Sequence, residues 1–164
     1  MQSLMEWIEA LPLAVLIHQK AWLFTTIQIV HVVAISIVIG SIAVMDLRLL
    51  GVGSRGRLVT EIAREVLPVT WVAFVIAALA GSLMFISQAT AYYMNTTFWV
   101  KMGIMLLAGI NMAVFELITV RGVQTWDVSP APPLPARVAG GVSLMCWLLV
   151  FVFGRWTSFT IMPS

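Results

Sequence analysis

Ionisable side chains are rare within the long apolar stretches of this 164-residue sequence. They are His31, Lys101, Glu116 and Arg155, joined by the neutral polar residues Gln28, Gln88 and Asn111. A titratable group at membrane depth is costly, so it usually faces the interior of a helix bundle or a cavity. This small set therefore holds the first candidates for chemistry.

His31 is the candidate metal ligand, because bundles of membrane helices hold b-type haem through axial imidazoles. The other histidine is His18, and a continuous helix would place the two about 20 Å apart. One iron cannot bind both. A haem would then need His31 with Met84, Met105 or Met112, an open position, or a histidine from a second chain. A neutral His31 that bonds to a neighbouring helix is the structural alternative.

Two other classes of ligand, Cu(I) and a quinone, would also use His31 together with other residues. Cu(I) prefers imidazole and soft sulfur, which His31, Cys146 and methionine would supply. A quinone would take hydrogen bonds from Gln28, His31 and Arg155 within an apolar slot. Lys101 and Arg155 would neutralise an acidic group on the ligand, such as a haem propionate. The sequence predicts no catalytic residue, because it contains none of the common nucleophile, metalloprotease or phosphate-binding motifs.

Several polar residues also have a purely structural interpretation. Lys101 and Arg155 lie close enough to the ends of their apolar stretches for their charges to reach the lipid headgroups. Asn111 can form a hydrogen bond between two helices. Asp46 and Arg48 are expected to pair with each other or with headgroups.

The elements that carry these residues are predicted to be membrane spans. The chain is 61% hydrophobic and 10% charged, whereas soluble domains average about 45–50% and about 25%. Four windows are long enough to cross a bilayer: about 21–45, 67–89, 98–120 and 138–162. The sequence therefore predicts an all-α, polytopic membrane protein, in which one domain over 1–164 forms an antiparallel four-helix bundle.

Shorter segments lie between and before these spans. Residues 3–11 and 58–67 each place apolar side chains on one helical face, which predicts short interfacial helices on the membrane surface. Four prolines between 130 and 135 predict an extended connector in the second half of 121–137.

Basic residues predict the orientation, because cytoplasmic loops retain lysine and arginine. Those of the first and third loops are Arg48, Arg55, Arg57, Arg64, Arg121 and Arg137. We expect both loops in the cytoplasm and both termini in the periplasm of a bacterial inner membrane. The net charge of +2 is too small to indicate nucleic-acid binding.

Short segments along most of the chain resemble a family of uncharacterised four-helix bacterial inner-membrane proteins. They are 31–33, 46–51, 67–71, 98–101, 108–111 and 154–156. The sequences Asp-Leu-Arg-Leu-Leu-Gly at 46–51 and Gly-Arg-Trp at 154–156 are the most specific. The arrangement is similar, more loosely, to copper-resistance proteins of the CopD type and to four-helix cytochromes b.

The resemblance marks His31, Lys101, Asn111 and Arg155 as motif positions. It also implies a histidine in relatives near the position of Glu116, so this chain departs from the pattern and a haem held by two histidines is disfavoured. We expect a membrane subunit that binds haem b or quinone in the outer half of the bundle and takes part in electron transfer. The alternatives are a non-catalytic anchor or scaffold in a larger complex or homo-oligomer, and transport of a metal or small solute. A stand-alone enzyme is not expected.

Overall fold

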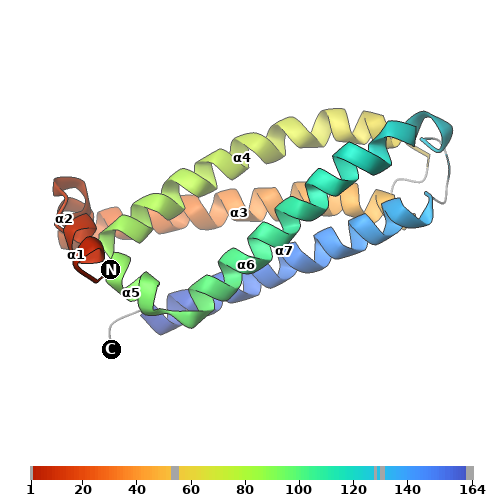
Figure 1. Ribbon diagram of the computed structural model, residues 1–164. Coiled ribbons are helices and arrows are strands. Elements are labelled where there is room, and N and C mark those ends of the chain that lie inside the picture. Colours follow the sequence, from red (N-terminus) through yellow and green to blue (C-terminus); the bar gives the residue numbers. More distant parts are fainter. Residues whose placement is uncertain (1, 53–55, 128, 130–131, 162–164) are drawn as a thin grey trace.

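The computed structural model describes residues 2–52, 56–127, 129 and 132–161, and these form an elongated bundle of helices (Figure 1). Its long helices are α3 (Ala21–Leu49), α4 (Val59–Ser87), α6 (Thr96–Val114) and α7 (Leu134–Ile161). They contain 29, 29, 19 and 28 residues, and all four are long and apolar enough to cross a bilayer. The chain is therefore a multi-pass, all-α membrane protein, as the sequence predicts.

Shorter helices complete the two ends of the bundle. The end that carries both termini, called here the terminal end, holds α1 (Gln2–Glu9), α2 (Pro12–Gln19) and α5 (Ala89–Met94) (Figure 1). There α1 packs on α5 and α2 packs on α4. The opposite end, called the loop end, holds the α3–α4 loop, a π-helical turn η1 (Phe115–Thr119) and a 3₁₀ helix η2 (Val120–Thr125).

The second membrane helix begins earlier than predicted. The separate surface helix expected over 58–67 is wrong, because α4 begins at Val59 and continues without a break through Pro68. Proline removes one backbone hydrogen bond, and membrane helices tolerate this loss when neighbouring groups pack well. Near this position the Thr70 hydroxyl donates to the Val66 carbonyl at 2.9 Å and lies 2.7 Å from the Ser41 hydroxyl of α3.

The predicted connector is also shorter than expected. Helix α7 begins at Leu134 rather than near Val138. Pro135 therefore lies in its first turn, where a backbone N–H has no partner within the helix and proline is tolerated.

The four long helices are arranged in the order α4, α3, α7, α6. Antiparallel pairs form between α3 and α4 and between α6 and α7, and α3 joins them by packing on α7. Over the described residues, α4 and α6 do not pack closely together although they are adjacent in sequence. The bundle is therefore open between these two consecutive spans.

A buried arginine ties the two loops of the loop end together. The Arg48 side chain has no exposed surface. Its Nε donates to the Arg57 carbonyl at 2.9 Å, and its Nη2 donates to the carbonyls of Asp127 and Ser129 at 3.0 and 3.1 Å. The expected Asp46–Arg48 pair is wrong, because Arg48 turns toward backbone carbonyls and Asp46 turns into the bundle.

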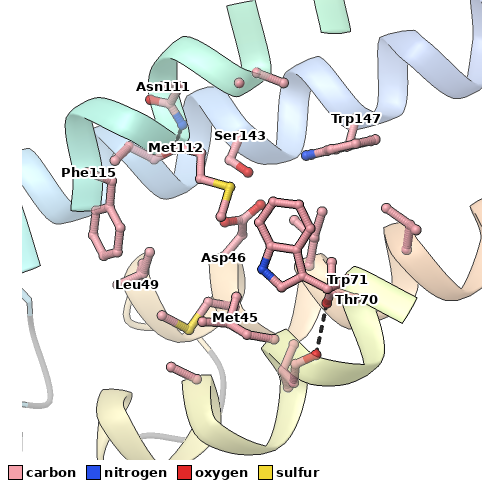
Figure 2. Close-up of a pocket in the computed structure, with 18 of the residues that line it drawn as sticks. Met45, Asp46, Leu49, Thr70, Trp71, Asn111, Met112, Phe115, Ser143 and Trp147 are labelled. Carbon is pink, nitrogen blue, oxygen red and sulfur yellow. Dashed lines mark hydrogen bonds between the residues drawn. The ribbon is translucent and has the colours of Figure 1, made fainter. Parts of the chain in front are cut away.

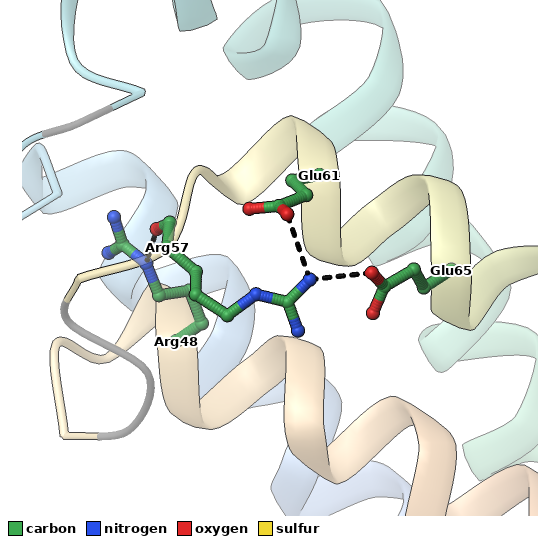
Figure 3. Close-up of polar contacts among 4 residues, drawn as sticks. All are labelled: Arg48, Arg57, Glu61 and Glu65. Atoms are coloured by element: carbon green, nitrogen blue, oxygen red, sulfur yellow. Dashed lines mark hydrogen bonds and ion pairs between the residues drawn. The ribbon is translucent and has the colours of Figure 1, made fainter.

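Two further contacts fix the start of α4. The Asp127 carboxylate accepts hydrogen bonds from the Thr60 N–H at 3.0 Å and the Thr60 hydroxyl at 2.5 Å. Slight burial opposes ionisation, but the hydrogen bonds from Thr60 outweigh it and lower the pKa of Asp127. On the surface, Arg57 bridges Glu65 and Glu61 at 2.6 and 3.2 Å (Figure 3).

Candidate functional site

A cavity of about 340 Å³ lies within the bundle near the loop end (Figure 2). All four long helices contribute to its lining. Its polar side chains come from Asp46, Thr60, Thr70, Asn111 and Ser143. The rest of the lining is almost entirely apolar and aromatic, which is typical of sites for small molecules.

Asp46 supplies a carboxylate to this cavity. Its side chain is only 4% exposed, and the carboxylate lies near Ser143 of α7. Its Oδ2 is enclosed and accepts no hydrogen bond from the described residues. Figure 2 shows the carboxylate between Ser143, Met112 and the Trp71 ring. An enclosed acceptor without a partner is destabilising by about 1–3 kcal/mol, so this atom is suited to a donor that the chain itself does not provide.

An aromatic wall forms one side of the cavity. The rings of Trp71 and Phe74 on α4 meet edge to face, with centroids 6.1 Å apart. Phe74 meets Trp147 of α7 in the same way at 6.4 Å. Trp71 is 52% exposed on the outside of the bundle while it lines the cavity. It therefore lies at the rim, where the cavity meets the surrounding lipid.

Some of the predicted residues lie in this cavity. Met105 and Met112 line it from α6, beside Asp46 rather than beside His31. Asn111 also lines it, and its Nδ2 donates to the Ala139 carbonyl of α7 at 3.0 Å. The hydrogen bond between helices that the sequence predicts for Asn111 is therefore confirmed.

His31 belongs to a second layer, nearer the terminal end. It lies 15 residues before Asp46 on α3, or about 22 Å along the helix axis. Its Nδ1 lies 2.8 Å from the Ala77 carbonyl of α4, and a carbonyl can only accept, so Nδ1 carries the proton. The ring packs against Gly81, where an added Cβ would lie 3.0 Å from Cε1.

Lys101 shares this second layer. Its aliphatic stem packs over Gly154 of α7, its Nζ lies 5.8 Å from the centre of the Phe98 ring, and its charge acts on His31. His31 and Lys101 therefore lie in the same layer, and their binding of a common ligand stays a prediction. No group of three or more histidine, cysteine or acidic side chains suited to a metal forms among the described residues.

The other predicted residues lie elsewhere. Arg155 is exposed on the outside of α7, where its guanidinium covers the Phe159 ring at 4.4 Å. Gln28 is half-buried on α3, and Gln88 lies between the end of α4 and the start of α5. Glu116 falls in η1, but its side chain lies outside the described residues.

The sequence analysis missed Asp46 and Ser143 as site residues. Asp46 stands in the segment 46–51, where charges mark the exit of a span, so an exposed role was expected. A signal was present in the sequence: Asp46 is one helical turn from Ile42 and Leu49, which line the cavity. Residues three and four positions apart share a helix face, and this face points inward.

A family comparison covers almost the entire chain. A model for a family of unknown function, DUF6644, matches residues 4–160. The chain belongs to this family. No curated protein and no solved structure matches it. Membership of DUF6644 supports the predicted resemblance to uncharacterised proteins, whereas similarity to CopD-type proteins or cytochromes b is not shown.

Proposed function

We propose that this DUF6644 protein binds a small, largely apolar molecule in the cavity at its loop end. The observation that carries the proposal is the apolar cavity itself, whose lining includes the unpaired and buried Oδ2 of Asp46. Its volume of about 340 Å³ falls in the usual range for ligand sites, about 300–1,000 Å³. The proposed site lies in the half of the bundle opposite to the outer half, where the sequence analysis expects the ligand.

The ligand would enter from the lipid between α4 and α6. These two helices lack close mutual packing over the part of the chain that is described, and both line the cavity. Trp71 stands at this opening, half-exposed. A molecule dissolved in the bilayer would therefore reach Asp46 without crossing a polar loop.

Energy transfer from tryptophan to N-phenyl-1-naphthylamine, a neutral apolar fluorophore, tests this proposal in nanodiscs of phosphatidylcholine. We expect saturable transfer above that of empty nanodiscs. Gly109→Phe should abolish the saturable part, because Gly109 lines the cavity and open space surrounds its Cβ position. Gly103→Phe on the same helix is the matched control, since open space also surrounds Gly103, which is outside the lining. Equal transfer in both variants would contradict the proposal.

His31 supports a second candidate, a haem or copper site with a role in electron transfer. Because Nδ1 donates to the Ala77 carbonyl, Nε2 keeps its lone pair, which is the form that binds a metal. A purified sample with a Soret band that disappears in His31→Ala would support haem. A colourless sample without metal by elemental analysis would remove both metal versions.

The orientation and assembly of the chain are also part of the proposal. The basic residues near the loop end favour a cytoplasmic position for that end, with both termini in the periplasm of a bacterial inner membrane. Cysteine accessibility at each end would test this. A homo-oligomer or a subunit of a larger complex would be recognised from the mass of the solubilised particle.

A further inference from the structure

The cavity contains a carboxyl group that has no cationic partner among the described residues. Asp46 Oδ2 is enclosed and unpaired, and the ion pairs of the described residues join Arg57 to Glu61 and Glu65 on the surface. Arg48, two residues further along α3, donates to backbone carbonyls instead. Removing a carboxylate from water without a partner is costly, so a ligand that supplies both a positive charge and a donor gains most here.

The walls around this carboxylate also suit a cation. Trp71, Phe74 and Trp147 form a continuous series of edge-to-face rings. The faces of such rings attract an ammonium group and remain apolar enough to hold a hydrocarbon body. The thioethers of Met105 and Met112 provide an adaptable opposite wall.

We propose that the ligand of this cavity is a lipophilic amine, bound as an ammonium ion that donates an N–H to Asp46 Oδ2. Its apolar body lies along Trp71, Phe74 and Trp147. This inference rests on the proposed function, because it names the chemical class of the molecule that the cavity binds. A neutral alcohol would make a weaker hydrogen bond to the same oxygen, and a carboxylate would be repelled.

Competition against bound N-phenyl-1-naphthylamine tests the inference with three probes that share one apolar body. They are 1-naphthylmethylamine, 1-naphthalenemethanol and 1-naphthoate, used at pH 7 in nanodiscs of zwitterionic lipid. A hydrogen bond to a charged group contributes about 1.5–3 kcal/mol, so we expect the amine to compete about tenfold or more better than the alcohol. The naphthoate should compete least.

Asp46→Asn should remove the advantage of the amine over the alcohol while the fluorophore still binds. Retained fluorophore binding shows that this variant is folded, so its result can be interpreted. Asp127→Asn, which removes a carboxylate outside the cavity lining, should keep the full advantage.

Two outcomes would overturn the inference and leave the proposed function in place. One is equal competition by amine and alcohol, which would indicate a neutral donor. The other is an amine advantage that persists in Asp46→Asn, which would place the cation elsewhere. If the fluorophore itself shows no saturable binding to the wild-type chain, the proposed function fails first.

Discussion

The two polar layers of the bundle differ in how their buried groups are paired. In the layer near the terminal end, His31 donates to the Ala77 carbonyl and packs on Gly81, so helix contacts enclose it. In the layer near the loop end, Asp46 is more deeply buried but keeps one carboxylate oxygen without a partner and faces open space. Burial of a polar side chain alone therefore does not identify a binding site. An unpaired polar atom beside a cavity is the more informative feature.

The largest loss of stability should come from substitution of Arg48, whose hydrogen bonds join the two loops of the loop end. Arg48→Met would remove the hydrogen bonds that Arg48 donates to the carbonyls of both loops, so we expect a loss of about 3 kcal/mol or more in unfolding free energy. Thermal unfolding in detergent measures this. Arg64→Met, at an exposed position of α4, should change stability little. Equal effects of the two variants would show that the Arg48 contacts are not what joins the loops.

The second largest loss of stability should come from substitution of Gly140, where α7 lies close to α3. An added Cβ at Gly140 would lie 2.9 Å from Leu49 Cβ and 3.1 Å from the Asp46 carbonyl. Gly140→Ala should therefore push α7 from α3 and cost about 1–3 kcal/mol. Gly103→Ala, which meets open space, should be neutral or slightly stabilising. Unfolding in denaturant compares the two, and a neutral Gly140→Ala would argue against this close approach of the helices.

A matched pair of glycines tests the packing of the terminal-end layer. Gly81→Ala would bring a Cβ within 3.0 Å of the His31 ring, whereas Gly154→Ala would make an ordinary 3.5 Å contact with the Lys101 stem. We expect a loss of about 1 kcal/mol for Gly81→Ala, as the ring turns away from the Ala77 carbonyl, and almost none for Gly154→Ala. Stability and the His31 NMR signal together would check this. An unmoved His31 signal in Gly81→Ala would contradict the described contact.

The smallest loss of stability is expected for substitution of Asp127, and this loss should depend on pH. Because the folded state lowers the pKa of Asp127, its contribution is complete above the unfolded pKa of about 4 and is lost as pH falls through the lower folded value. Asp127→Asn should cost about 1 kcal/mol at pH 7, as for the loss of a helix cap. The difference from wild type should shrink in acid. A difference that stays constant down to pH 2 would contradict the role of the carboxylate.

The sequence predicts the bundle well, because long apolar stretches have few alternatives to spanning helices. It also predicts the hydrogen bond of Asn111 between helices. It misplaces the start of α4, since a proline inside a membrane helix looks like a boundary. It misses Asp46 because the side chain's direction depends on how α3 packs on α7, and Gly140 allows that approach from almost one hundred positions away. The ligand-binding roles of His31 and Lys101 stay a prediction.

Photolabelling tests the central claim, that the loop-end cavity is the ligand site, most directly. A neutral apolar diazirine would be activated in nanodiscs with and without excess N-phenyl-1-naphthylamine, and the labelled peptides would be mapped by mass spectrometry. We predict labelling that the competitor removes at Trp71, Met105 and Met112. Competitor-sensitive labelling around His31 and Lys101 instead, or labelling that the competitor leaves unchanged throughout the chain, would contradict the account.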